Sequence, residues 1–186
     1  MVLFIIFLGV VAIVIIAMIT MYNRLVRLRA TADSSWSDID VQLKKRYNLV
    51  PSLVETVKGY AAHEKTVFQN VTEARSKAMQ ATSPGEQAEA ENMLRGALKS
   101  LFAVAEAYPD LKASTNFMQL QQQLSELENS IEAARRYYNA VARDLNTMIQ
   151  SFPSNMIASM FGFSLREYFQ IESEEERKPI RPDFSS

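Results

Sequence analysis

The chain has 186 residues, with 20 lysines and arginines against 21 aspartates and glutamates. This near-neutral balance gives no reason to expect nucleic-acid binding. The absence of cysteine excludes disulfides, thiolate metal sites and cysteine nucleophiles. The sequence contains only five glycines and six prolines, and it lacks short alternating β-branched runs, so we expect an all-α protein.

Residues 1–21 carry no charged side chain, and Thr20 is their only polar one. As a helix this run is about 30 Å long, enough to cross the hydrocarbon core of a bilayer. It is too long for the core of a signal peptide and ends at bulky Met21-Tyr22, which favours an uncleaved anchor (1–22) over a cleaved signal peptide. Basic residues follow the run and none precedes it, which predicts an external N-terminus and a cytoplasmic C-terminal part. These basic residues are Arg24, Arg27 and Arg29.

The chain after the anchor shows the apolar spacing of one long helix. Apolar residues recur at steps of three and four from Trp36 to Ala61, and then at Phe68 and Val71. Pro51 removes a backbone donor from this stretch, so we expect a kink or a break near residues 49–50. A split at Pro51 or at a loop would divide the stretch into two segments.

Two further helices are predicted. Ser83, Pro84 and Glu86 have the spacing of a capping box, so a second helix should begin there and run over 86–108 until Pro109. The third, over 113–152, has apolar residues alternating at steps of four and three without a miss, and this a/d seam calls for partner helices along its whole length.

We therefore expect a long antiparallel, four-helix-like bundle over 23–171, with the first helix kinked at Pro51. The charged tail over 172–186 carries two prolines and is predicted to be disordered.

Three stretches in this order behind an apolar N-terminus resemble the bacterial LemA family. They are residues 44–64 (KKRYNLVPSLVETVKGYAAHE), 106–117 (EAYPDLKASTNF) and 134–146 (ARRYYNAVARDLN). Gly162-Phe163 and a tail with Pro182-Asp183-Phe184 extend the resemblance over essentially the whole chain. Asn48 and Ser52 are mild departures, since family members more often carry Asp and Asn at these places.

The resemblance implies a single-pass protein of the bacterial inner membrane with its bundle in the cytoplasm and no established catalytic activity. Magnetosome relatives suggest, as a hypothesis, a role in organising or remodelling membranes.

The residues themselves give no sign of catalysis or of a metal or cofactor site. His63-Glu64 begins like a zinc-protease motif, but Val67 stands where the second histidine is needed, and His63 is the only histidine. The glycines form no phosphate-binding loop. We expect a non-enzymatic protein without cofactor, metal or small-molecule substrate.

Three groups of residues remain as candidate contact sites. The first is basic and would either bind anionic lipid headgroups or form a solvated face; it comprises Arg24, Arg27, Arg29, Lys44, Lys45 and Arg46. On a straight helix Lys44 would lie about 35 Å beyond the span, too far for lipid contact unless the helix bends back. The second is Arg135-Arg136-Tyr137-Tyr138-Asn139, either a buried polar network that fixes helix register or a site for an acidic partner.

The third group is the apolar stretch over 156–163. It contains Met156, Met160, Phe161 and Phe163, and would either cap the core or form an exposed partner or membrane-docking patch.

These features favour a membrane-anchored helical scaffold or interaction protein that binds the bilayer through its N-terminal helix and associates with itself or with a membrane protein. Leu124 and Ile131 are the seam positions that would carry assembly if part of the seam were intermolecular. Membrane remodelling or lipid binding is the alternative, as is an accessory subunit of a membrane protease or signalling complex.

Overall fold

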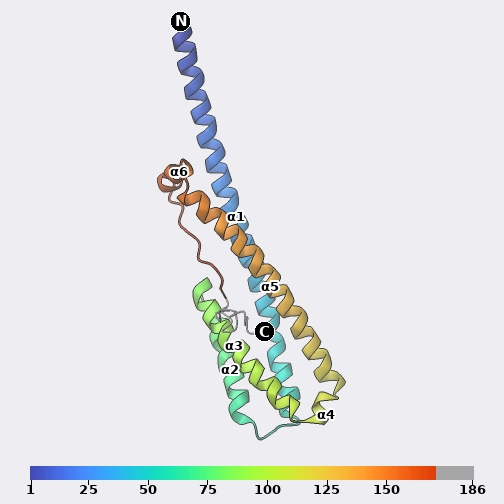
Figure 1. The fold of residues 1–186 in the computed structure, drawn as a ribbon. Coiled ribbons are helices and arrows are strands. Elements are labelled where there is room, and N and C mark those ends of the chain that lie inside the picture. The colour runs from blue at the N-terminus through green and yellow to red at the C-terminus, as the bar shows by residue number, and fades with distance from the viewer. Residues whose placement is uncertain (171–186) are drawn as a thin grey trace, which may run out of the picture. The chain divides into compact units, whose positions relative to one another are not determined.

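The structure is a computed structural model that describes residues 1–170 of the chain. These residues form helices and connecting turns without any strand, as predicted (Figure 1). The chain divides into two compact units. Unit 1 comprises Met1–Asp40 and Ala133–Tyr168, and unit 2 comprises Val41–Glu132 together with Phe169 and Gln170. The predicted disordered tail over 172–186 lies outside the described residues.

Unit 1 is built from the first part of α1 (Val2–Lys58), the last part of α5 (Thr115–Gln150) and the short α6 (Ser154–Met160). Trp36 packs on Tyr138 with the ring centroids 5.3 Å apart, and Leu25 belongs to the same buried cluster as Leu145. Residues early in α1 therefore contact residues late in α5, so the two helices run antiparallel. The core of this unit consists of Leu25, Ala32, Val141, Leu145, Ile157 and Ala158.

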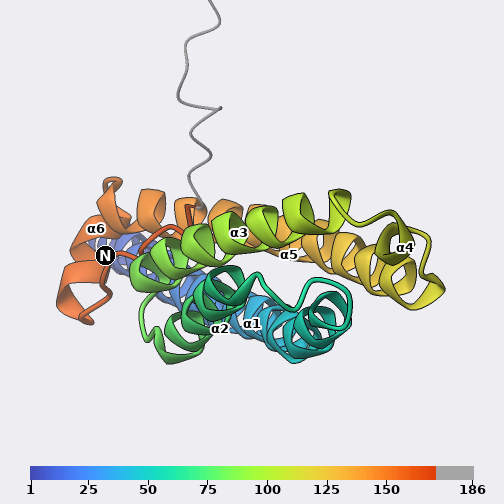
Figure 2. The ribbon, with the colours of Figure 1, turned by 90° about the horizontal axis from the view of Figure 1, so that it is seen from below.

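Unit 2 is a four-helix arrangement made by the end of α1, α2 (Lys65–Gln80), α3 (Pro84–Glu106) and the beginning of α5, with the one-turn α4 (Pro109–Lys112) before α5. Helices α2 and α3 pack against each other (Figure 2). Each helix turns a row of apolar side chains inward, at the three–four spacing that the sequence showed. The buried residues include Leu43, Val50, Leu53, Val57, Phe68, Val71, Leu94, Leu98, Leu101, Phe117, Leu124 and Ile131.

The start of α3 forms as the sequence predicted. The Ser83 hydroxyl accepts a hydrogen bond from the Glu86 backbone N–H at 3.2 Å, and the Glu86 carboxylate accepts from the backbone N–H of Ser83 at 3.4 Å, which is a complete capping box with Pro84 as the first helical residue. Backbone and hydroxyl hydrogen bonds from Thr82, together with the backbone bond from Ser83, lower the pKa of Glu86. The predicted third helix is also confirmed, because α5 spans Thr115–Gln150.

Two expectations about the helices need correction. Pro51 does not break the first helix: α1 continues through it and ends at Lys58, so the division into two segments falls at the turn over 59–64. Phe152, which fits the seam of the third helix by spacing, lies beyond the end of α5 and is 81% exposed.

The contacts of Tyr47 explain how the helix tolerates Pro51. Proline has no N–H to donate to the carbonyl four residues before it, which here belongs to Tyr47. The Arg75 guanidinium on α2 donates to that carbonyl through Nε at 2.7 Å instead. A side chain from a neighbouring helix therefore replaces the missing backbone donor.

Candidate functional site

Residues 2–16 of α1 are all exposed, and Met21 is the first residue of the helix that packs against the core of unit 1. Among the described residues, α1 is the one helix long and apolar enough to cross a membrane, and its most apolar window is not buried at all. The hydroxyl of Thr20 donates within its own helix, to the carbonyls of Ile16 at 2.9 Å and Ala17 at 2.8 Å. This leaves the only polar side chain of the segment satisfied in the absence of water, as a hydrocarbon environment requires.

Three of the six candidate lipid-contacting residues follow this segment directly. Arg24, Arg27 and Arg29 are all exposed, and the guanidinium carbon of Arg29 lies 4.9 Å from the centre of the Phe163 ring. This cation–π contact fixes one arginine against the end of the α6 region. The other two remain open to solvent or to anionic groups.

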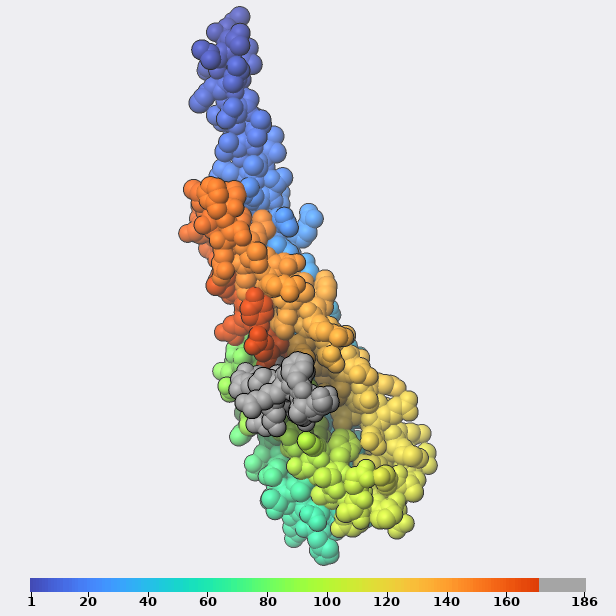
Figure 3. Space-filling view, viewed as in Figure 1, coloured from blue at the N-terminus to red at the C-terminus, as the bar shows by residue number. Residues whose placement is uncertain are grey.

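Helix α6 is held beside α1 at the point where the apolar segment ends. The ring of Tyr22 lies 4.6 Å from that of Phe161 and 6.1 Å from that of Phe163, centroid to centroid. Ile157 and Ala158 are buried in the core of unit 1. The space-filling view shows α6, in orange, as a protrusion beside the blue α1 (Figure 3).

The end of α6 is a Schellman motif. The Phe163 N–H donates to the Ala158 carbonyl at 2.9 Å and the Gly162 N–H to the Ser159 carbonyl at 3.3 Å. Gly162 has a φ of 68°, the left-handed conformation that this motif requires and that glycine adopts at the lowest cost. The motif turns the chain so that Phe163 packs back on the core while Phe161 stays exposed.

The segment after α6 is tied to both long helices of unit 1. Asn146 on α5 donates through Nδ2 to the Arg166 carbonyl and accepts from the Arg166 N–H, both at 2.8 Å. The Arg166 guanidinium pairs with Asp33 on α1. Tyr138 donates its hydroxyl to the Glu167 carbonyl at 2.8 Å, and burial raises the pKa of Tyr138 above the usual value of 10.0.

The stretch over 156–163 has a buried and an exposed side, and its role as a docking patch stays a prediction. Its inner face caps the core through Ile157 and Ala158, and Phe163 packs partly buried on the same cluster. Met156, Met160 and Phe161 are 62%, 68% and 53% exposed. The exposed patch is therefore real, but Phe163 is only at its edge.

The basic cluster at 44–46 does not act as one unit. Lys44 and Lys45 are exposed, whereas Arg46 is 1% exposed and lies in the core of unit 2. Its Nη1 is 2.5 Å from Oε1 of Glu128 on α5, and its Nη2 pairs with Glu91 on α3, which is also 1% exposed. The prediction that Arg46 contacts lipid is therefore wrong, because two carboxylates of the same chain hold it inside.

Two polar residues that the sequence did not single out complete this charged core. Tyr47 donates its hydroxyl to Glu91. Gln87 donates through Nε2 to the Tyr47 hydroxyl at 2.7 Å, to the Ala78 carbonyl at 3.1 Å and to Glu91 Oε1 at 3.1 Å. These contacts join α1, α2, α3 and α5. This buried network is centred on Arg46, and the network considered for Arg135 and Arg136 stays a prediction.

The remaining candidates lie on α5. Leu124 and Ile131 are 5% and 2% exposed, so both pack inside the chain and neither forms an accessible assembly surface. Arg135 is half-buried and Arg136 exposed, and both interact with other residues of the chain.

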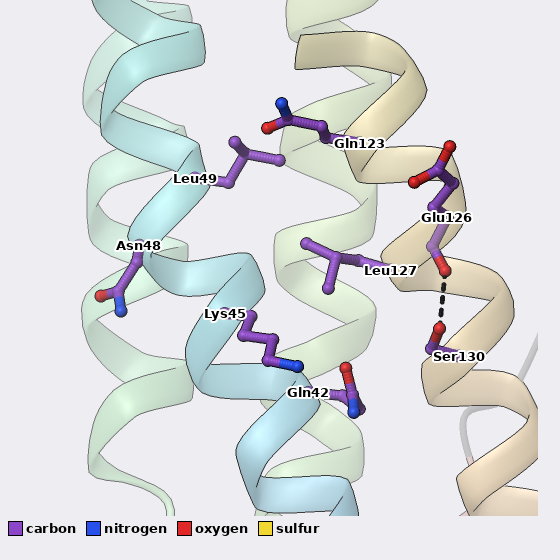
Figure 4. Close-up of a pocket in the computed structure, with 8 residues that line it drawn as sticks. All are labelled: Gln42, Lys45, Asn48, Leu49, Gln123, Glu126, Leu127 and Ser130. Carbon is purple, nitrogen blue, oxygen red and sulfur yellow. Dashed lines mark hydrogen bonds between the residues drawn. The ribbon is translucent and has the colours of Figure 1, made fainter. Parts of the chain in front are cut away.

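An open groove of about 510 Å³ runs between α1 and α5 in unit 2 (Figure 4). Leu49 and Leu127 supply apolar surface from the two sides, and polar side chains surround them. Lys45 lies on the α1 side and Glu126 on the α5 side, so opposite charges line opposite walls. The full lining is Gln42, Lys45, Asn48, Leu49, Gln123, Glu126, Leu127 and Ser130.

The part of the chain that the structure describes contains no cluster of three or more metal-ligating side chains. His63 lies exposed on the turn between α1 and α2. The buried acidic and phenolic groups of unit 2 are instead used in contacts with one another.

The sequence of the chain is similar to those of known bacterial proteins. The sequence model of the LemA family matches residues 35–184, which begins after the apolar segment. Protein LemA of Metamycoplasma hominis is 32% identical over 162 residues, covering 85% of this chain and 72% of that protein. Magnetosome protein MamQ 2 of Paramagnetospirillum magneticum is 27% identical over 175 residues, covering 80% of this chain and 64% of the relative. The chain thus spans less than two thirds of the length of that MamQ protein.

Proposed function

Because this chain belongs to the LemA family, we propose that it is a membrane-anchored, non-enzymatic helical interaction protein of the bacterial cell membrane. The observation that carries the proposal is the continuity of α1, whose fully exposed apolar part runs without a helix break into the packed bundle. Such a segment avoids water by entering a bilayer, and the bundle is then held next to the membrane. The fixed role of Arg46, Glu91 and Tyr47 in core contacts supports a structural use of the buried polar groups.

The proposed orientation has the N-terminus outside and the bundle in the cytoplasm, on the basis of Arg24, Arg27 and Arg29 after the apolar segment. The natural absence of cysteine makes a clean test possible. Ser125→Cys introduces one thiol at an exposed position of α5. We expect a membrane-impermeant thiol reagent to label it only after cell lysis, and resistance of the protein to alkaline carbonate extraction. Labelling in intact cells would reverse the orientation, and release by carbonate would refute the anchor.

We extend the proposal to self-association through the groove between α1 and α5, with a second copy of this chain as the occupant. In a twofold-symmetric pair each surface meets its own copy, so Lys45 of one chain would face Glu126 of the other. Leu49 and Leu127 would supply the apolar centre of this contact.

Charge reversal tests this pairing. Lys45→Glu should shift the protein in mild detergent from dimer to monomer, as measured by light scattering, and Lys45→Glu/Glu126→Lys should restore the dimer. Lys99→Glu, at an exposed position of α3, is the matched control and should leave the mass unchanged. A wild-type protein that is monomeric at all concentrations would remove self-association from the proposal but leave the anchor intact.

Lipid binding by the bundle is the second candidate function. The specific observation in its favour is the exposed apolar surface of α6 next to the end of the apolar segment.

A further inference from the structure

We propose that α6 is a second membrane-contacting element, which lies in the headgroup region of the same leaflet from which α1 emerges. The inference rests on the proposed anchoring by α1. Phe161 touches Tyr22, the residue that directly follows the apolar segment. Figure 1 shows α6 beside α1. If residues 2–21 fill the hydrocarbon core, which they match at about 30 Å, the exposed side of α6 is at the depth of the membrane surface.

The composition of the α6 region fits this depth. Residues 151–165 contain no charged side chain. Met156 and Met160 lie four residues apart on the outer face of α6, and Phe152 and Phe161 flank it, all more than half exposed. Aromatic and methionine side chains of this kind are typical of helices that lie in the interface plane with the apolar face among the headgroups and upper acyl chains. A face turned permanently to water would be expected to carry polar residues.

The charges nearby complement a bilayer surface. Arg24 and Arg27 are exposed within two turns of the end of the apolar segment, where a guanidinium can pair with lipid phosphate. Arg29 stacks on Phe163 and is thereby directed to the same side as α6. Apolar side chains that enter the interface are thus accompanied by cations that bind its anionic groups.

The depth of α6 is set by rigid contacts rather than by a flexible tether. Ile157 and Ala158 are buried in the unit 1 core, the Schellman motif at Gly162 fixes the exit of the helix, and the Asn146–Arg166 hydrogen bonds hold the segment after it. Because the apolar segment of α1 belongs to the same compact unit as α6, a bilayer that accepts this segment also contacts α6. The two contacts together would hold unit 1 at a defined angle to the membrane.

The test measures the depth of α6 in the full-length protein, reconstituted in vesicles of phosphatidylethanolamine and phosphatidylglycerol. Met160→Cys and, separately, Met156→Cys carry an environment-sensitive NBD label at exposed positions whose loss should not disturb the core. The matched control is Ser37→Cys, which is exposed in the same unit but lies about 24 Å further along α1 than Met21. Lipids with a nitroxide near the headgroup, or at the end of the acyl chain, serve as quenchers.

We expect blue-shifted emission at 156 and 160 and several-fold stronger quenching by the headgroup nitroxide than at 37, with the acyl-end nitroxide less effective. Quenching at 160 no stronger than at 37 would overturn the proposal. Blue-shifted emission without lipid quenching would also overturn it, because a protein surface would then cover α6. Carbonate extraction of the same samples distinguishes failure of the α6 proposal from failure of the proposed anchor. A retained protein with an unquenched probe contradicts the α6 proposal alone, whereas an extracted protein contradicts the anchor.

Discussion

Removal of the Arg46 side-chain charge should be among the most damaging single changes in the bundle. In Arg46→Met the apolar stem is kept while the guanidinium is lost, so the change leaves Glu91 buried at 1% exposure without its cation. Loss of one partner of a buried ion pair costs about 3–5 kcal/mol, because the remaining charge has neither water nor a counter-ion. In a protein of this size that corresponds to a fall in melting temperature of roughly 6–20 °C.

The exposure of the two carboxylates predicts unequal effects. Glu128 is one third exposed, so it can turn toward water, and Glu128→Gln should cost no more than about 1 kcal/mol. Glu91→Gln preserves an oxygen acceptor for Tyr47 and Gln87, so Arg46→Met/Glu91→Gln should recover much of the stability lost in Arg46→Met. Such recovery in the double variant would show that the loss comes from the unpaired charge rather than from altered packing.

The assay is urea or thermal unfolding of the full chain in mild detergent, followed by far-UV circular dichroism. Lys99→Met changes an exposed cation on α3 and should stay within about 0.5 kcal/mol of wild type. If the free energy of unfolding of Arg46→Met stays within about 1 kcal/mol of wild type, the reasoning from buried charge is wrong. The same holds if the double variant is as unstable as Arg46→Met.

Four further outcomes are expected. Gly162→Ala should lower stability by about 1–2 kcal/mol in thermal unfolding, because φ is 68° there, whereas Gly96→Ala, at an open position within α3, should raise it slightly. Asn146→Ala removes two hydrogen bonds to Arg166 and should cost about 1–3 kcal/mol and speed amide exchange at Arg166. Ser83→Ala should cost about 1 kcal/mol through loss of the α3 cap; an unchanged melting temperature would show that the box contributes nothing. Burial raises the pKa of Tyr138 above 10.0, so the phenol ionises at a lower pH in the unfolded chain than in the folded one. Its contribution to the free energy of unfolding is therefore present below pH 10 and is lost as the pH rises through the folded pKa. Tyr138→Phe should reduce this loss of stability in unfolding curves measured over a pH series.

The elements that the sequence predicted correctly are those that depend on local chemistry. The capping box at Ser83 involves residues three apart, and the apolar seam of α5 follows from helical periodicity alone. Pro51 is the opposite case. Its effect on α1 depends on Arg75, which lies on another helix and whose contact with the Tyr47 carbonyl no local pattern reveals.

The candidate site residues likewise divide into those that sequence neighbours reveal and those that depend on contacts between helices. Arg24, Arg27 and Arg29 could be placed directly after the apolar segment because they adjoin it in sequence. Arg46 could not be told from Lys44 and Lys45, since its burial depends on Glu91 and Glu128, which come from two other helices. A weak signal did exist: Arg46 precedes Tyr47, which belongs to the apolar row from Trp36 to Ala61, and an arginine beside such a row is a candidate for an internal ion pair. The contact between Tyr22 and Phe161 depends on residues 139 positions apart in the chain, which periodicity does not relate.

The packing of Trp36 on Tyr138 supplies a native spectroscopic probe. Trp36 is the single tryptophan of the chain, and both rings belong to unit 1, so intrinsic fluorescence reports on that unit while circular dichroism reports on all helices. Helices α1 and α5 run through both units. Coincident fluorescence and dichroism transitions would mean that these shared helices make the chain a single cooperative folding unit, whereas separate midpoints would mean that unit 1 and unit 2 unfold independently.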